Sequence, residues 1–209
     1  MDETFTLLPL QIDPSSKALS ALSLPDLSSH LTTLNALHRT LLSLPSENHA
    51  TPPAPLPSNP KRTAQIDKMR DQANSLLRKS SPASAQEAVK LYTYAIEMAL
   101  GRPGWEPAGM VREQASVLFA NRSQAYMAVQ MWPEGASDAE TSVGLKRVGN
   151  GKAWWRRGRC LMEMGRWEEA RTWVKEGVEV EGGGEGAGEL ANLGKEIEAE
   201  MGRRGMVVG

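Results

Sequence analysis

The chain has 209 residues, 40% of them hydrophobic, which is enough for one ordinary domain with an extension and a buried core. Its formal net charge of -1 argues against a general affinity for nucleic acid, because nucleic-acid-binding domains usually carry a strong basic excess. A single cysteine, Cys160, excludes an internal disulfide and a cysteine framework, and this favours a reducing compartment such as the cytosol.

Two features of the sequence bear on membranes. No run of residues approaches the roughly 18 consecutive apolar residues that a membrane span needs. The start MDETFTLLPLQIDP carries acidic residues where a signal peptide would carry positive charge. We therefore expect no direct membrane span, and any attachment to a membrane would come through a partner protein.

Residues 1–45 predict a small α/β-type segment. The apolar stretch FTLLPLQI has the character of a short strand, and PDLSSHLTTLNALHRTLLSLP has leucines spaced three to seven residues apart, as on one face of a helix. This stripe consists of Leu27, Leu31, Leu34, Leu41 and Leu44. One strand and one helix bury too little surface to be stable alone, so we expect the segment to dock on the chain's own C-terminal domain or on another chain.

Residues 46–62 predict a linker. The stretch SENHATPPAPLPSNP contains five prolines among small polar residues, a composition that continues neither a helix nor a central strand. We therefore place a domain boundary here and expect the second domain to span residues 63–204.

After the linker the pattern becomes helical and repeats. WPEGASDAETSVGL begins at Trp132, and WEEARTWVKEGVEV begins 35 residues later at Trp167; in both, a small residue follows the tryptophan after two positions. An earlier copy lies in AQEAVKLYTYAIEMA, where Ala88, Tyr92 and Ala95 occupy small, large and small positions. We predict three copies, at about residues 65–100, 113–147 and 151–182.

The small and large positions explain how successive helices pack. A small residue four before a bulky one, and seven before another small one, lets two antiparallel helices approach closely while the bulky side chain fills the gap. A hairpin of this kind cannot bury its outer face alone, so a closing helix is required. The stretch ELANLGKEIEAEM, after the flexible glycine-rich turn EGGGEGAGE, supplies a capping helix at 187–203 with an apolar side made of Leu190, Leu193, Ile197 and Met201.

This array resembles the tetratricopeptide repeat (TPR) family, and the third copy carries the resemblance. Its matching positions are Trp154, Gly158, Leu161, Gly165, Trp167, Ala170, Val174 and Gly177. The departures are Ala73 in place of the first repeat's glycine, the longer turn SSPAS, the inserted loop GRPGWEPAGMVR and the missing closing prolines. The resemblance implies an all-α, three-repeat TPR helical solenoid with a C-terminal capping helix.

Within that family, the sequence is most similar to three-repeat modules that hold the acidic C-terminal tails of cytosolic chaperones, which typically end in EEVD. Such modules use a carboxylate clamp: a cation and an asparagine on the first repeat, an asparagine on the second, and a lysine and an arginine on the third. The residues that match this pattern are Arg70, Asn74, Asn121, Lys152 and Arg156. The resemblance implies that they bind a peptide carboxylate through charge-assisted hydrogen bonds.

Helical spacing fits this interpretation. Residues four apart on a helix share a face, so Arg70 should project with Asn74, and Lys152 with Arg156, while Trp154 lies on the packed side of GKAWWRRGRC. The first helices of stacked hairpins line the concave surface. We therefore expect the five clamp residues to converge on one groove.

The order of parts also resembles the small TPR subunits of the fungal Sec complexes, which serve post-translational translocation into the endoplasmic reticulum. This resemblance rests on the extension, the linker, the stretch AIEMALGRPGWEP and the stretch RWEEAR. It implies a non-catalytic adaptor without a cofactor, peripheral on the cytosolic face of the endoplasmic reticulum. Such an adaptor would bind a membrane-anchored Sec partner subunit through residues 1–45 and receive heat-shock protein 70.

Several residues keep two interpretations. Trp155 is either a packing residue or a groove platform for an apolar tail residue, and Arg157 and Arg159 either support the clamp or are solvated surface. Cys160 is expected to be a buried small residue. No metal site is predicted, because the histidines stand at no metal-ligand spacing: His30, His38 and His49.

Three other functions compete with the translocon adaptor. A nucleic-acid binder would use GKAWWRRGRC, but tryptophans on a packing face cannot also stack on bases. An enzyme would need a general base near a nucleophile, a metal cluster or a phosphate loop, and the sequence shows no such motif. A generic cochaperone that binds the tail of heat-shock protein 90, or a scaffold not tied to the translocon, is the remaining alternative.

Overall fold

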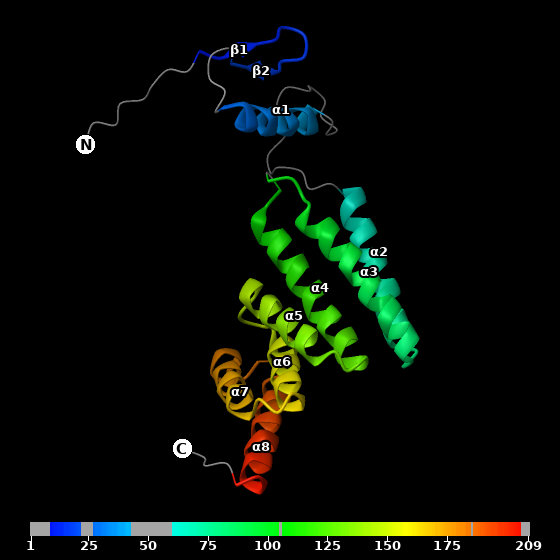
Figure 1. Cartoon of the computed structure of the whole chain (residues 1–209), viewed down its shortest axis with the longest axis vertical. Helices are drawn as coiled ribbons and strands as arrows, with labels where there is room; N and C mark the ends of the chain where they lie inside the picture. Colours follow the sequence, from blue (N-terminus) through cyan, green and yellow to red (C-terminus); the bar gives the residue numbers. More distant parts are fainter. Residues whose placement is uncertain (1–8, 22–26, 43–59, 105, 185, 206–209) are drawn as a thin grey trace, which may run out of the picture. The chain divides into compact units, whose positions relative to one another are not determined.

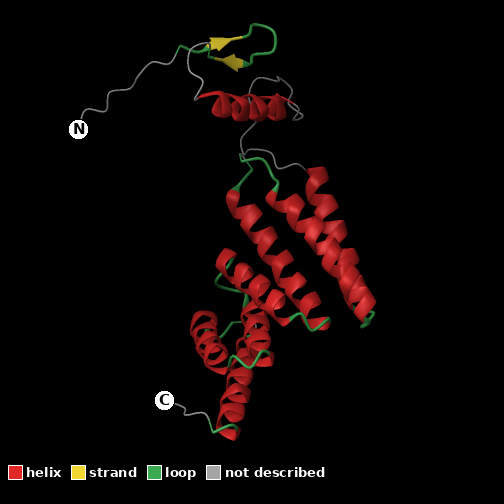
Figure 2. Cartoon of the chain, viewed as in Figure 1, coloured by secondary structure: helices red, strands yellow, loops and turns green. Residues whose placement is uncertain are grey.

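A computed structural model describes residues 9–21, 27–42, 60–104, 106–184 and 186–205 of the chain. The chain divides into two compact units, Met1–Pro57 and Ser58–Gly209, and each is described by itself. The described residues of the N-terminal unit form a small hairpin and one helix, and those of the C-terminal unit form seven helices (Figure 1 and Figure 2).

The N-terminal unit begins with a two-stranded antiparallel hairpin, in which strand β1 (Gln11–Ile12) pairs with strand β2 (Leu19–Ser20). Its turn is held by the carboxylate of Asp13, which accepts hydrogen bonds from the backbone N–H groups of Ser15 and Ser16 at 3.0 and 2.6 Å. The stretch FTLLPLQI predicted the first strand. The second was not predicted, because two residues are too few to show an alternating pattern.

Helix α1 (Ser28–Leu42) carries part of the predicted leucine stripe. Leu31 is buried, and the side-chain amide of Asn35 exchanges two hydrogen bonds of 2.8 Å with the backbone of Leu19. Leu34 and Leu37, however, are 47% and 36% exposed. The described residues of this unit therefore cover only part of the apolar face of α1.

Some predictions fall outside the described residues. These predictions concern the start of the first strand (residues 5–8), Leu44, and the proline-rich stretch 46–59, which includes His49. The side chain of Leu41 also lies outside the described part of the chain. Of the predicted linker only its last residues are described. They are helical, because helix α2 begins at Pro60 and proline is favoured in the first turn of a helix.

The helices of the C-terminal unit form three antiparallel hairpins followed by a closing helix (Figure 1). They are α2 (Pro60–Leu77), α3 (Pro82–Leu100), α4 (Ala108–Ala128), α5 (Trp132–Leu145), α6 (Gly151–Glu163), α7 (Trp167–Glu181) and α8 (Ala187–Arg203). Each helix packs on the next one along the chain, and α6 also packs on α8. The predicted all-α solenoid with a capping helix is confirmed.

The loop between the first two hairpins is shorter than predicted, since α4 begins at Ala108 and not near residue 113. Arg102 lies in this loop with its side chain buried. Its guanidinium donates hydrogen bonds to Glu106 at 2.5 Å, to Gln114 at 2.9 Å and to Thr63 at 2.9 Å. These contacts tie the loop to α2 and α4, and no sequence motif indicated them.

The first hairpin shows the predicted small and large positions. Ala73, Ala88, Tyr92 and Ala95 are all fully buried at the contact between α2, α3 and α4. Alanine at position 73 is therefore small enough to serve where the repeat usually has glycine.

The core of the third hairpin is built around Trp154. Its indole N–H donates to the carbonyl of Arg147 at 3.0 Å, and its ring lies 4.2 Å from that of Trp173. Gly177 on α7 makes room for it, because a Cβ at that position would stand 2.9 Å from the ring. A Cβ at Gly158 would stand 2.5 Å from Val174. The small residues of the repeat thus permit the close helix contacts that the sequence predicted.

The closing helix α8 buries the four predicted apolar residues, Leu190, Leu193, Ile197 and Met201, against the last hairpin. The turn before it uses glycine at a positive φ, 91° at Gly186, where a side chain would be strained. Glu181, at the end of α7, has a structural role that the sequence did not predict. Its carboxylate is buried and accepts hydrogen bonds from the backbone N–H groups of Gly149 and Asn150 at 3.1 and 2.8 Å, which fixes the approach to α6.

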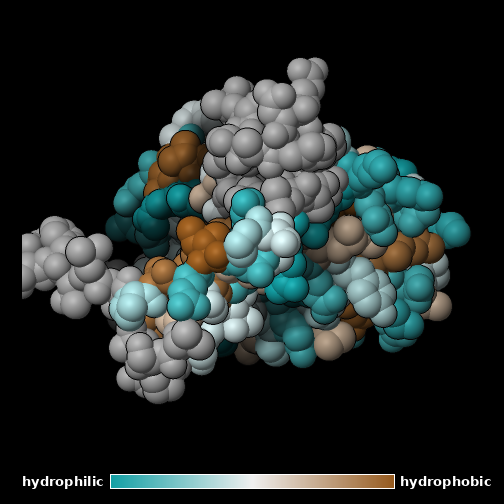
Figure 3. Space-filling model, turned by 90° about the horizontal axis from the view of Figure 1, so that it is seen from above, coloured by the Kyte–Doolittle hydropathy of each residue, from teal (hydrophilic) through white to brown (hydrophobic). Residues whose placement is uncertain are grey.

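The described surface in Figure 3 is largely hydrophilic, with apolar residues in separate small groups. None of the helices in the described part of the chain has both the length and the apolar character needed to cross a bilayer. The described residues also contain no cluster of three or more His, Cys, Asp or Glu side chains that could hold a metal ion.

Candidate functional site

The predicted clamp residues lie on the first helices of the three hairpins. Helix α2 carries Arg70 and Asn74, α4 carries Asn121, and α6 carries Lys152 and Arg156. Helix α4 contacts both α2 and α6, so these three helices form one row along the solenoid. The spacing of four residues turns each pair to one side of its helix.

Arg70 is engaged by two acidic residues of its own helix. Its guanidinium lies 2.9 Å from the carboxylate of Asp67 and 3.2 Å from that of Asp71. Ion pairs as exposed as these contribute only about 0–1 kcal/mol. A bound carboxylate would nevertheless compete with both acids for Arg70, which the sequence pattern did not reveal.

Asn74 is held by a residue of the second helix of its hairpin. The hydroxyl of Tyr92 donates a hydrogen bond of 2.5 Å to the Oδ1 atom of Asn74. Burial raises the pKa of Tyr92 to about 12, against the opposing effect of the nearby charges of Arg156 and Arg70. Tyr92 therefore keeps its proton at neutral pH, and its hydroxyl lies within electrostatic reach of cations on both α2 and α6.

Arg156 is fixed by two acceptors on α4. Its guanidinium donates hydrogen bonds of 2.7 Å to the carbonyl of Ala120 and of 2.7 Å to the side chain of Gln124. Burial lowers the pKa of Arg156, an effect that Tyr92 and Cys160 oppose. Arginine nevertheless stays charged at neutral pH. The structure thus places a partly desolvated cation at the contact of α4 with α6.

The two remaining clamp residues are less constrained. Lys152, one turn before Arg156, is exposed and makes no ion pair within the described part of the chain. Asn121 is half-buried and directly follows Ala120, the residue whose carbonyl Arg156 holds. Asn121 is therefore adjacent in sequence to a residue that Arg156 contacts, on the helix that α6 packs against.

Two hollows open along this row of helices. The first, of about 500 Å³, lies between α2 and α4 and includes Arg70. The second, of about 670 Å³, lies among α4, α5, α6 and α8 and includes Lys152 and Arg156. The five residues therefore do not line one common hollow, and Asn74 and Asn121 line neither of the two.

The residues that kept two interpretations now have definite surroundings. Trp155 both packs against the core around Trp154 and lines the second hollow. Arg157 is neither solvated nor directed at the clamp: it pairs with Glu140 and lies 4.5 Å from the centre of the Trp173 ring. Arg159 also lines the second hollow, but it pairs with Glu163 at 2.7 Å and with Glu196 at 2.9 Å.

Cys160 is buried, as predicted. Its burial, reinforced by Glu163, raises the pKa of the thiol to about 12, so Cys160 is protonated at neutral pH and unsuited to nucleophilic chemistry.

Sequence reasoning missed two residues next to the clamp. Gln124 holds Arg156, and Tyr92 holds Asn74. Tyr92 was identified only as the large packing residue of the first repeat. No sequence signal could place its hydroxyl, because the tip of a core side chain ends wherever the neighbouring helices leave room.

Comparison with known proteins relates the chain to translocation subunits. No protein-family model matches it. A curated Schizosaccharomyces pombe protein, the ER protein translocation subcomplex subunit sec67, is 36% identical over 129 residues, which cover 61% of this chain. The matched residues span 65% of the length of sec67, slightly less than two thirds.

Comparison with solved structures identifies the fold. A chain of the S. cerevisiae Sec complex matches with a TM-score of 0.62 at 18% identity, covering 93% of this chain and 98% of that one. The second TPR domain of human RPAP3, in complex with the HSP70 peptide SGPTIEEVD, matches with a TM-score of 0.51 at 22% identity, covering 66% and 98%. The first TPR domain of Spaghetti (RPAP3), bound to the HSP90 peptide SRMEEVD, matches with a TM-score of 0.51 at 22% identity, covering 66% and 97%. The C-terminal unit is thus a TPR solenoid, and the sequence resemblance to a TPR subunit of the Sec complex agrees with both kinds of comparison.

Proposed function

We propose that the chain is an adaptor that binds the acidic C-terminal tail of a cytosolic heat-shock protein 70 through its TPR unit and docks the chaperone at the translocon of the endoplasmic reticulum. The observation that carries the first part is the arrangement around Arg156. This cation is held by α4 and acts on the hydroxyl of Tyr92, which in turn binds Asn74 of α2. The contacts thereby link Arg156 of the third repeat with Asn74 of the first, which supports a common ligand for the two.

The chemistry of the ligand follows from these donors. A C-terminal aspartate presents two carboxylates within a few ångströms, and cations together with asparagine amides can satisfy both through charge-assisted hydrogen bonds. Each such bond contributes roughly 1.5–3 kcal/mol. Ordering a flexible tail costs on the order of 2–5 kcal/mol, so we expect micromolar affinity, which suits transfer of the chaperone better than permanent capture. Because Arg70 is shared with Asp67 and Asp71, Lys152 and Arg156 should contribute more.

Removing the two α6 cations tests the clamp. In the full chain, Lys152→Ala with Arg156→Ala should weaken binding of an SGPTIEEVD peptide with a free C-terminus by about 100-fold or more, because two charge-assisted bonds are lost. Fluorescence anisotropy with a labelled peptide measures the change. The matched control is Lys175→Ala with Lys195→Ala, two exposed lysines of α7 and α8, which should bind as the unchanged chain does.

Two further measurements keep the clamp test decisive. Arg156 also anchors α6 to α4, so thermal unfolding must show that the double variant is folded, and Lys152→Ala alone, at an exposed site, should still weaken binding by about tenfold. A peptide with an amidated C-terminus should bind poorly. If it binds as tightly as the free acid, the carboxylate clamp is wrong.

The second part of the proposal concerns the N-terminal unit. Its described residues leave a set of apolar side chains exposed on β1 and α1, at fractions of 62% for Ile12, 47% for Leu34 and 36% for Leu37. The similarity to sec67 supports a partner in the translocation complex. We therefore propose that these residues bind a membrane-anchored subunit of the Sec complex, which would hold the chain at the endoplasmic reticulum.

Charged substitutions on α1 test this attachment. Much less of the variant Leu34→Asp with Leu37→Asp should co-purify with the detergent-solubilised Sec complex than of the unchanged chain. The reason is that two carboxylates would be buried at an apolar interface. Thr33→Asp, also exposed on α1, is the control and should co-purify normally. Equal recovery of both variants would contradict attachment through this face.

A second candidate for the tail ligand is heat-shock protein 90, because related folds are found with either type of tail peptide. Titration with SRMEEVD beside SGPTIEEVD compares the two directly. A clear preference for SRMEEVD would favour a cochaperone of heat-shock protein 90 over the proposed role.

A further inference from the structure

Tyr92 combines a core position with a polar tip at the clamp. Its ring is fully buried in the first hairpin, in the same apolar cluster as Ala88 and Ala95. Its hydroxyl lies beside Asn74, at 2.5 Å from Oδ1, and the charges of Arg156 and Arg70 act on it. A packing residue of the repeat therefore ends beside Asn74 of α2 and within electrostatic reach of Arg156 on α6.

The direction of the Tyr92–Asn74 hydrogen bond follows from this environment. The buried phenol keeps its proton at neutral pH and can donate it. The surrounding arginine charges favour an orientation in which the oxygen lone pairs of the hydroxyl face the cations, so its proton points to the oxygen of Asn74. The amide of Asn74 must then present its Nδ2 hydrogens on the opposite side, since the oxygen and nitrogen of a carboxamide lie on opposite arms.

We propose that Tyr92 is a positioning residue of the tail-binding site: its hydroxyl locks the Asn74 amide with both Nδ2 hydrogens free to donate to a carboxylate. This inference rests on the proposed function and deepens it, because it assigns a role to a residue outside the five clamp positions. Without the hydroxyl, the Asn74 amide can turn over. Its oxygen would then face the ligand carboxylate for part of the time and repel it.

The variant Tyr92→Phe tests this role in the full chain. It keeps the buried ring and removes only the hydroxyl, so we expect binding of the free-acid SGPTIEEVD peptide to weaken by about three- to tenfold, the range of one hydrogen bond. Tyr94→Phe is the matched control, because Tyr94 lies on the same helix but is 58% exposed. It should bind the peptide with unchanged affinity.

A positioning role can be distinguished from a merely structural one by measuring the effect of Tyr92→Phe in a second chain, one that lacks the Asn74 side chain. If Tyr92 acts through Asn74, then Tyr92→Phe should have no further effect on peptide affinity in a chain that already carries Asn74→Ala. A loosened hairpin would instead weaken binding by the same factor in both backgrounds and lower the unfolding temperature. An equal weakening of binding in both backgrounds would overturn the inference, whereas a lower unfolding temperature alone would not, because the loss of one hydrogen bond already lowers the stability.

The outcomes also separate this inference from the proposed function. If the unchanged chain fails to bind SGPTIEEVD, the clamp proposal fails and the role of Tyr92 falls with it. If the unchanged chain binds but Tyr92→Phe binds equally well, the clamp stands and only the positioning role is wrong.

Discussion

Replacing Trp154 with alanine is expected to lower the free energy of unfolding by about 3–5 kcal/mol, the usual cost of removing a buried aromatic side chain. Trp154 is fully buried among α6, α7 and α8, and it also donates a hydrogen bond of 3.0 Å to the carbonyl of Arg147. The cavity cannot collapse easily, because Gly177 and the Trp173 ring already lie against the indole. Since small proteins are stable by only about 5–15 kcal/mol, this change should remove a large part of the stability of the third hairpin.

Urea unfolding of the full chain, followed by circular dichroism, measures this effect. If Trp154→Ala does not fold, Trp154→Phe provides a milder version that should still cost about 1–3 kcal/mol, because it loses volume and the indole donor. Val148→Ala is the control at a site that is 66% exposed, and it should change the stability by less than about 0.5 kcal/mol. A loss below 1 kcal/mol for Trp154→Ala would contradict its assignment as the centre of this core.

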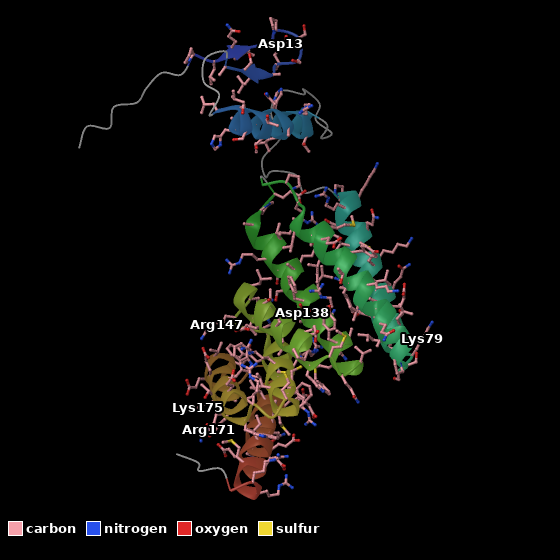
Figure 4. All side chains as sticks on the ribbon, viewed as in Figure 1. Asp13, Lys79, Asp138, Arg147, Arg171 and Lys175 are labelled. Atoms are coloured by element: carbon pink, nitrogen blue, oxygen red, sulfur yellow. The ribbon has the colours of Figure 1, made fainter. Side chains whose placement is uncertain are left out.

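Breaking the ion pair between Arg122 and Asp138 is expected to cost about 3–5 kcal/mol, because one charge would be left buried without its partner. Arg122 on α4 donates two hydrogen bonds to the Asp138 carboxylate on α5, at 2.7 and 2.8 Å, and a third of 2.9 Å to Thr93 on α3. The pair therefore joins the two helices of the second hairpin, and the bond to Thr93 ties them to the first hairpin. Figure 4 shows Asp138 among the helices, whereas Lys79 lies at the tip of the α2–α3 hairpin.

A double-mutant cycle measures this pair. Arg122→Met and Asp138→Ala should each destabilise strongly, whereas the double variant should cost less than the sum of the two by about 1–3 kcal/mol. The control cycle uses Lys146 and Glu113, whose ion pair of 2.9 Å is exposed, and its coupling should be at most about 1 kcal/mol. Additive effects at Arg122 and Asp138 would show that the pair does not hold α4 and α5 together.

Neighbouring arginines of α6 illustrate how tertiary contacts assign roles. Arg156, Arg157 and Arg159 look alike in the stretch GKAWWRRGRC. In the structure, however, Arg157 is stacked on Trp173 and paired with Glu140, and Arg159 is paired with Glu163 and Glu196. Of these three arginines, only Arg156 is held by uncharged acceptors, the carbonyl of Ala120 and the side chain of Gln124. Because these acceptors do not neutralise its positive charge, Arg156 can still attract an anionic ligand.

The fold was largely predictable from the sequence, because local patterns carry it. The recurrence of small and large residues at a fixed offset predicted three hairpins, and the apolar stripe of ELANLGKEIEAEM predicted the closing helix. These features depend on residues that are near one another in the chain. The short strand β2 and the early start of α4 were missed, since each depends on contacts that leave no periodic trace.

The sequence by itself determined which chemical groups the first helices of the three hairpins carry: the predicted cations and asparagines, which lie on α2, α4 and α6. Only the tertiary structure decided which of those groups are available to a ligand. Asp67 and Asp71 form ion pairs with Arg70. Helix α4 accepts hydrogen bonds from Arg156, and the hydroxyl of Tyr92 donates one to Asn74. The physical reason is that charge availability and amide orientation depend on atoms that meet across helices, at distances in the chain that no local pattern records.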